Sequence, residues 1–370
     1  MSDENPKVTV IMPSLNVADF IDECITSVTK QSLSDIEIIC IDAGSTDGTL
    51  EILKSHASKD SRVSLIHSDR KSYGHQMNVA MSQARGEYIG IVETDDYVDS
   101  EMFEKLYSSN LNGKADVVKA SFYHVYENGD MKKDRAKSGH VTENEAFSIE
   151  EFPAFIKGHP SIWAGIYRRE FLEKNGITFI EEAGGGWVDN PFFYETAFAA
   201  DSIVYMDDAY YYYREFNPTS SSNNLNDYTI PIRRMLDNLD VYDKYGKKSE
   251  GIAKMVHMRA FAYLNNIKRR DYFDENLPEV RPLLCEMMSR LDEEYIKKNY
   301  SADQQLEYYR YLSPLRLKSD FTDDEYEKLI KENDFLYEFI SELQNKKTEK
   351  KPKETNNTKS SFKSRFRKIF

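Results

Sequence analysis

The feature that most constrains the fold is an alternation of short apolar segments with amphipathic ones along the first third of the chain. Apolar runs rich in β-branched residues predict buried strands, and apolar residues at helical spacing predict helices. The expected strands are residues 7–12, 36–41, 62–67, 88–92 and 115–122. The expected helices are residues 19–30, 49–57, 75–84 and 100–111. This alternation predicts an α/β fold with a mainly parallel central sheet.

Polar residues gather where three of these strands end, at residues 13–16, 42–47 and 93–96. Because the carboxyl ends of parallel strands share one edge of a sheet, we expect a ligand site there. The last cluster, Glu93-Thr94-Asp95-Asp96, suits Mg²⁺ or Mn²⁺, which in turn hold substrate phosphates. A solvated turn after an ordinary strand is the alternative. The glycines at 44 and 48 match neither a P-loop nor a dinucleotide fingerprint, which disfavours a nicotinamide enzyme.

The net charge of −14 is unevenly distributed. Residues 346–370 contain ten Lys and Arg against two Glu, a net charge of +8, which leaves −22 on residues 1–345. So acidic a body disfavours nucleic-acid binding, and it would need a metal to hold a polyanionic substrate. Three cysteines without metal-type spacing, a polar start and no long apolar run predict a cytoplasmic protein.

Taken in order, these motifs resemble the family 2 glycosyltransferases, bacterial enzymes with the GT-A nucleotide-sugar fold. The resemblance covers roughly residues 7–222. It rests on Val10–Asn16, Ile41–Thr49, Gly74–Asn78, Ala84–Ile89 and Glu93–Asp96. It implies a metal-dependent, inverting transfer of a hexosyl or N-acetylhexosaminyl group from a nucleotide-diphosphate sugar, with UDP as the expected nucleotide. The acceptor would be a hydroxyl of a glycan or lipid-linked glycan in cell-surface polysaccharide or glycoconjugate synthesis.

The resemblance also implies donor-binding residues. Pro13 and Leu15 would line the nucleobase pocket, although Leu15 replaces an aromatic residue often found there. Asp42 matches the first acid of the family's Asp-Asp-Gly-Ser turn, and Ala43 replaces the second, which leaves the identity of the nucleotide less constrained. The full expected donor set is Pro13, Leu15, Asn16, Asp42, Asn78, Asp95 and Arg214.

The metal and the reaction are assigned in the same way. The metal ligands would be Asp96, as the principal one, and Asp95, which would otherwise contact the ribose; the ion would be Mn²⁺ or Mg²⁺. Glu93 stands where Asp is usual, and we expect it to support the ligands rather than bind the metal.

The catalytic base of the family is the Asp of a Glu-Asp pair, and Val188-Asp189 takes that place, so Asp189 would be the base. A helix N-cap is the alternative role for Asp189, and the two are compatible. Arg214 would reach the leaving diphosphate, with a surface ion pair as its alternative. Three glycines before Trp187 would allow either a mobile lid or a plain connection.

The rest of the chain carries no chemical motif. We expect a catalytic domain at 1–225, a helical extension at 226–345 and a disordered basic tail at 346–370. The extension would pack on the catalytic domain or on a second copy of the chain. Residues 361–370 suit a membrane-surface helix at the inner face of the plasma membrane, with a frayed basic tail as the alternative.

Neither a Gln-x-x-Arg-Trp motif nor a membrane span occurs, which favours a non-processive enzyme. Two rivals are a nucleotidyltransferase and a catalytically inactive carbohydrate-binding scaffold. The first would carry a Gly-rich basic loop after the first strand, which is missing. The retention of Asp95, Asp96 and Asp189 argues against the second.

Overall fold

The computed structural model describes residues 5–134, 145–217, 227, 229–269 and 273–312. The chain forms two compact units, Met1–Asn265 and Asn266–Phe370. The segment 361–370, for which membrane contact was predicted, lies outside the described residues. In the part of the chain that is described, no helix combines the length and the apolar character needed to cross a membrane.

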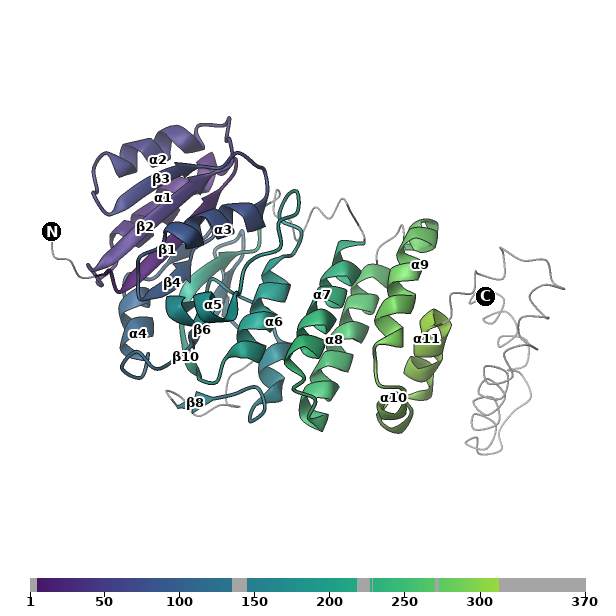
Figure 1. Cartoon of the computed structure of the whole chain (residues 1–370). Helices are drawn as coiled ribbons and strands as arrows, with labels where there is room; N and C mark the ends of the chain where they lie inside the picture. The colour runs from purple at the N-terminus through teal and green to yellow at the C-terminus, as the bar shows by residue number, and fades with distance from the viewer. Residues whose placement is uncertain (1–4, 135–144, 218–226, 228, 270–272, 313–370) are drawn as a thin grey trace, which may run out of the picture. The chain divides into compact units, whose positions relative to one another are not determined.

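One large sheet runs through the first unit (Figure 1). Strands β3, β2, β1 and β4 lie in that order and pair in parallel. The sheet continues with β9, β6, β10 and β5, of which β9 is antiparallel to both of its neighbours and β5 is antiparallel to β10. The strands are β1 (Val8–Ser14), β2 (Ile36–Asp42), β3 (Val63–His67), β4 (Tyr88–Ile91), β5 (Tyr97–Val98), β6 (Val117–Val125), β9 (Gly165–Arg168) and β10 (Ile203–Arg214).

Two short strands extend this sheet: β7 (Met131–Lys133) pairs with β6, and β8 (Ala146–Phe147) pairs with β10. Every residue of β1, β2 and β4 is buried, which explains why their sequences are nearly continuous apolar runs. The predicted α/β class with a mainly parallel central sheet is confirmed. The antiparallel insertion of β9 between β4 and β6 was not predicted.

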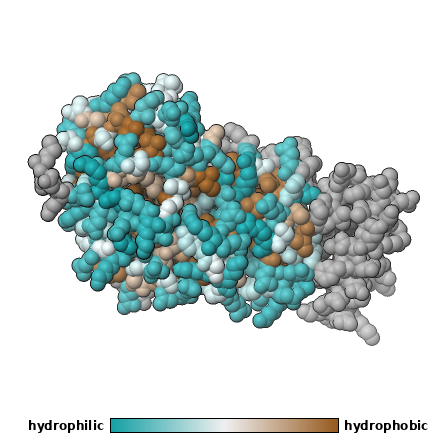
Figure 2. Space-filling view, viewed as in Figure 1, coloured by the Kyte–Doolittle hydropathy of each residue, from teal (hydrophilic) through white to brown (hydrophobic). Residues whose placement is uncertain are grey.

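The first four helices of this unit lie where the sequence predicted helices (Figure 1). The first of them buries Ile21, Cys24, Ile25 and Val28, which recur at helical spacing. The helices are α1 (Ala18–Thr29), α2 (Thr49–Ala57), α3 (Tyr73–Gln83), α4 (Met102–Ser108), α5 (Arg169–Asn175), α6 (Asp189–Ala199), α7 (Ile230–Tyr245) and the 3₁₀ turn η1 (Pro153–Lys157), together with α8 (Glu250–Lys268) as far as Asn265. On the face shown in Figure 2, hydrophilic residues cover most of this unit, with smaller hydrophobic areas between them.

The predicted domain boundary after residue 225 stays a prediction, but the first compact unit runs further, to Asn265. It includes α7, which packs against α6. In the second unit, α11 (Ala302–Leu312) packs against α9 (Phe273–Ser289), and α10 (Glu293–Asn299) lies between them in the chain. The Asp292 side chain caps α10 by accepting a hydrogen bond from the Tyr295 amide at 3.0 Å.

Candidate functional site

Three strand ends meet at one edge of the sheet. Ser14 at the end of β1 lies opposite Asp42 at the end of β2, and the acidic segment 93–96 follows β4, the neighbour of β1 on its other side. Thr94 Oγ1 donates a hydrogen bond to the Pro13 carbonyl oxygen at 2.7 Å, which ties the acidic segment to β1. The predicted convergence of the three polar clusters is therefore present.

Asp42 is fully buried and offers one free acceptor. Its Oδ2 accepts hydrogen bonds from the amides of Gly44 (2.9 Å) and Ser45 (3.0 Å). Its Oδ1 is buried and has no hydrogen-bond partner among the described residues. A buried acceptor left in this state costs free energy unless a ligand donates to it. Asp42 can therefore receive a donor from a bound molecule.

The loop after β1 is bound to the loop after β2. Asn16 donates from its amide to Ser45 Oγ, and its Oδ1 accepts from the Thr46 amide, both at 2.9 Å. Asn16 has a φ of 54°, a left-handed conformation that asparagine tolerates better than most residues. Pro13 is buried, whereas Leu15 is half-buried and Asn16 is exposed. These contacts hold the predicted donor-binding loops together.

Asp96 is buried, with both carboxylate oxygens hydrogen-bonded. Oδ2 accepts from the Tyr211 hydroxyl and Oδ1 from the Arg214 amide, each at 2.8 Å. Burial, followed by the neighbouring charge of Asp95, raises the pKa of Asp96 well above its ordinary value. Asp95 Oδ2 accepts from Asn217 Nδ2 at 2.7 Å. A cation bound here would relieve the repulsion between these two carboxylates.

Glu93 belongs to the same cluster, more centrally than the sequence suggested. Its Oε1 accepts a hydrogen bond from the Tyr73 hydroxyl at 2.6 Å. Burial raises the pKa of Glu93 to about 8, and the charges of Asp95 and Asp189 act in the same direction. Glu93 therefore lies within electrostatic reach of both the predicted metal ligands and the predicted base.

Arg214 lies beside the acidic segment at the end of β10. Its guanidinium pairs with Glu23 and donates to the Asp95 carbonyl oxygen at 2.5 Å. It also stacks over the Tyr97 ring, 4.7 Å from the centroid. The structure thus brings Arg214 beside the predicted metal ligands, with its charge engaged by Glu23.

Asp189 is the first residue of α6, and the residue in the N-cap position is Val188, with no side-chain cap hydrogen bond. Asn190 Nδ2 donates to Asp189 Oδ1 at 3.1 Å. Burial raises the pKa of Asp189 above its ordinary value, and the positive charge of Arg259 opposes that rise. A carboxylate with a raised pKa is a stronger base than an exposed one, which suits proton abstraction near neutral pH.

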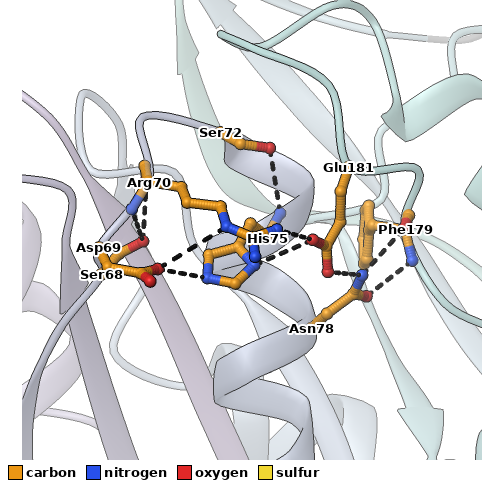
Figure 3. Close-up of polar contacts among 8 residues, drawn as sticks. All are labelled: Ser68, Asp69, Arg70, Ser72, His75, Asn78, Phe179 and Glu181. Atoms are coloured by element: carbon orange, nitrogen blue, oxygen red, sulfur yellow. Dashed lines mark hydrogen bonds and ion pairs between the residues drawn. The ribbon is translucent and has the colours of Figure 1, made fainter.

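Asn78 is in a different place from the other predicted residues. Figure 3 shows its side-chain amide pointing toward residues 179 and 181. Nδ2 donates hydrogen bonds to the Phe179 carbonyl oxygen (2.9 Å) and to Glu181 Oε1 (3.0 Å), and Oδ1 accepts one from the Phe179 amide (2.8 Å). His75 joins the same cluster, with its two ring nitrogens 3.0 Å from Glu181 Oε2 and 2.9 Å from Asp69 Oδ1. All polar atoms of the Asn78 side chain are engaged within the protein, so the structure favours a scaffolding role.

The close approach of α3 to this segment explains Gly74. A Cβ atom at position 74 would lie 2.0 Å from the Ile180 carbonyl oxygen. Gly184 is held to the same helix start, because the Tyr73 amide donates to its carbonyl oxygen (3.0 Å) and its amide donates to the Lys71 carbonyl oxygen (2.9 Å). The segment leading to Asp189 is therefore anchored on α3, and the predicted lid motion of the three glycines stays a prediction.

We predict that Asn78→Ala lowers the free energy of unfolding by about 1–3 kcal/mol, since it leaves Phe179 backbone groups without their partner. The dissociation constant for UDP should stay within about twofold of that of the unsubstituted protein. Urea unfolding and calorimetric titration measure the two quantities. Ser82→Ala is the matched control, because Ser82 is exposed on the same helix and bonds only within it. Weakened UDP binding with unchanged stability would instead support direct contact of Asn78 with the donor.

Four functional candidates were missed from the sequence: Tyr73, Tyr211, Asn217 and Arg259. Tyr211 had a usable signal, because strand alternation in the run Tyr210–Tyr213 places Tyr211 and Tyr213 on one face. The other three are brought in by long-range packing, for which a single sequence holds no signal.

The chain is similar in sequence to known glycosyltransferases. A sequence model described as glycosyl transferase family 2 matches residues 9–176. The uncharacterized glycosyltransferase EpsJ of Bacillus subtilis (strain 168) is 34% identical over 240 residues, covering 63% of this chain and 66% of the relative, just under two thirds of its length. The uncharacterized glycosyltransferase YibD of Escherichia coli (strain K12) is 30% identical over 253 residues, covering 65% of this chain and 73% of the relative.

The fold is shared with a solved structure. The crystal structure of S. aureus TarS 1–349 in complex with UDP-GlcNAc superimposes with a TM-score of 0.68 at 22% sequence identity. The match covers 82% of this chain and 87% of that one. With the sequence relatives, it leads to one conclusion: this chain belongs to glycosyl transferase family 2.

Proposed function

We propose that this chain is a metal-dependent, inverting glycosyltransferase that moves a sugar from a UDP-sugar to a hydroxyl of a glycan or lipid-linked glycan acceptor. The observation that carries the proposal is the meeting of the acidic segment after β4 with the ends of β1 and β2, and Asp189 lies within electrostatic reach of Glu93 in that segment. A proton acceptor beside an acidic strand-end cluster is the arrangement that such a transfer needs. The UDP-GlcNAc complex of a protein with the same fold supports UDP as the nucleotide.

The nucleotide would bind along the ends of β1 and β2. The unpaired Asp42 Oδ1 can accept a hydrogen bond from a nucleobase N–H. Pro13 and Leu15 would contact the base, with Asn16 holding the loop that surrounds it. Asp95 would reach the ribose or the metal. The described contacts of Asn78 do not require it in this set.

A divalent cation fits the donor atoms present. Among the described residues there is no cluster of three His, Cys, Asp or Glu side chains placed to hold a metal. Mg²⁺ and Mn²⁺ are commonly held by one or two carboxylates together with substrate phosphates, so Asp95 and Asp96 would suffice. When bound, the ion would act as a Lewis acid on the leaving diphosphate.

Residues of the protein would accept the proton of the acceptor hydroxyl and orient the reacting groups. Asp189 would take the proton of the acceptor hydroxyl, whose oxygen forms a bond to the anomeric carbon as the bond from that carbon to the diphosphate oxygen breaks. The electron pair of the broken bond leaves with the nucleoside diphosphate, and attack from the opposite side inverts the configuration. Because Arg214 pairs with Glu23, its predicted contact with the diphosphate would require exchange of that partner.

Thermal unfolding with added ligands tests the donor part of the proposal. UDP with Mn²⁺ should raise the unfolding temperature, because a ligand that binds the native state stabilises it. UDP with EDTA should raise it much less, and NAD should not raise it at all. No shift with UDP at any Mn²⁺ concentration would overturn UDP as the nucleotide; a shift of equal size in EDTA would overturn the metal.

A further inference from the structure

A buried arginine of α8 is hydrogen-bonded to Asn190, the residue next to the predicted base. Arg259 is buried, and its Nη1 donates to the carbonyl oxygens of residues 156 (3.2 Å), 157 (3.3 Å) and 158 (2.9 Å), at the end of η1. Its Nη2 donates to Asn190 Oδ1 and, at 3.3 Å, to the Tyr263 hydroxyl oxygen. One guanidinium therefore joins α8 to the 156–158 segment and to the start of α6.

Asn190 connects Arg259 to the neighbouring Asp189 by hydrogen bonds to both residues. Its Oδ1 accepts hydrogen bonds from both Arg259 and the Tyr263 hydroxyl, the latter at 2.5 Å. Rotating the amide by half a turn would place its NH₂ group against these two donors. The amide is therefore locked with Nδ2 toward Asp189 Oδ1, at 3.1 Å. An arginine is suited to this task, because its planar fork bonds several acceptors in a fixed geometry.

We propose that Arg259, acting through Asn190 and with Tyr263, is a positioning residue that holds the Asp189 carboxylate in place for proton abstraction from the acceptor. The inference rests on the proposed function, because it assigns Asp189 as the base. It gives a role in the reaction to α8, a helix that carries no sequence motif.

Several titratable groups lie within electrostatic reach of Asp189. They are Arg259 and Tyr263 of α8, Glu93 after β4, Tyr73 of α3 and Tyr167 of β9. Arg259 is the cation of this set, and its charge opposes the rise of the Asp189 pKa that burial causes. Loss of Arg259 should therefore raise the pKa of Asp189 further, and the base would lose its proton only at higher pH.

The test is the pH dependence of Mn²⁺-dependent UDP-sugar hydrolysis, with water in place of the acceptor and UDP-GlcNAc as the first probe. For Arg259→Met we expect kcat to fall about 10–100-fold, as a misplaced catalytic group does. The acidic limb of the kcat/KM profile should move about one pH unit upward. The dissociation constant for UDP should stay within about threefold. Arg259→Lys keeps the charge and should restore the position of the limb, with only part of kcat.

Two further variants keep the test decisive. Tyr263→Phe removes one hydrogen-bond donor to Asn190 and leaves the charge of Arg259. We therefore expect kcat to fall a few-fold with little movement of the acidic limb. This variant also serves if Arg259→Met does not fold.

Arg62→Met is the matched control, because Arg62 pairs with Asp60 just before β3, at the opposite edge of the sheet. It should show unchanged kinetics.

An unchanged limb and kcat in a folded Arg259→Met would overturn the positioning role, as would a loss explained wholly by weaker UDP binding. Normal hydrolysis by Asp189→Asn would instead overturn the proposed function, so the two failures are distinguishable.

Discussion

Replacing Asp189 by Asn is expected to lower the rate of UDP-sugar turnover by about 10³-fold while UDP and Mn²⁺ still bind. Asn has nearly the shape of Asp but cannot take a proton, and a positioned general base contributes about 10²–10⁴-fold to a rate. The side chain lies at the start of α6, and its partner Asn190 Nδ2 loses a charged acceptor but keeps a carbonyl oxygen in reach. The fold should therefore survive.

The control for this variant is on the same helix. Glu195 forms an ion pair with Lys244 and is not part of the Asp189 cluster. Glu195→Gln should keep turnover within about twofold of that of the unsubstituted protein. Steady-state rates of UDP release measure both variants, and titration with UDP measures binding. More than a tenth of the original rate in Asp189→Asn would exclude Asp189 as the base.

The second large effect is expected at Asp96. Asp96→Asn should weaken UDP binding in the presence of Mn²⁺ by about 100-fold, close to 2.7 kcal/mol of binding free energy. The reason is that a carboxylate is a far better ligand for a hard cation than a neutral amide is. The Asn variant in Mn²⁺ should then bind UDP about as weakly as the unsubstituted protein in EDTA. Isothermal titration in the two buffers makes the comparison.

Asp208→Asn is the matched control for Asp96→Asn. Asp208 is an exposed carboxylate on β10, the strand that also supplies Tyr211 and Arg214 to Asp96. Its substitution should leave UDP binding unchanged. Equal UDP affinity of Asp96→Asn and the unsubstituted protein, in Mn²⁺, would remove Asp96 from the metal site.

Much of the first half of the fold could be predicted from the sequence, because the information is local. The helix predicted at 49–57 coincides with α2, and the strand predicted at 36–41 matches β2 to within one residue. The three polar strand ends could be placed on one edge because parallel strands share direction. By contrast, the antiparallel β9 enters between β4 and β6 through long-range pairing, and nothing in its own four residues specifies those partners.

The candidate site was predictable where a residue's role follows from its place in a strand. Asp42, Asp95 and Asp96 lie where the pattern put them. The assignment of Asn78 to the donor stays a prediction, and a motif match could not show that its amide forms hydrogen bonds with residue 179, about a hundred positions away. Arg259 was not found for the same reason: apart from Tyr263 on the same helix, the hydrogen-bond partners described for it lie 69 and 101–103 positions away.

The excess of negative charge at this edge has a mechanistic meaning. Glu93 lies within electrostatic reach of Asp95, Asp96 and Asp189, and the nearby Arg214 is already paired with Glu23. A diphosphate would be repelled by this cluster on its own. A divalent cation bound together with the donor would offset the negative charges of the carboxylates and of the diphosphate. We therefore predict that UDP binding depends on the metal.

Phosphorus-31 NMR of the protein with Mg²⁺ and a set of UDP-sugars (UDP-glucose, UDP-galactose, UDP-GlcNAc and UDP-GalNAc) distinguishes a metal-dependent glycosyltransferase from the alternatives, because it identifies the nucleotide product. We predict that the resonances of UDP grow with at least one of them, and that this growth stops in EDTA and in Asp189→Asn. Release of UMP with a sugar phosphate, or formation of UDP at an unchanged rate in Asp189→Asn with EDTA, would contradict it.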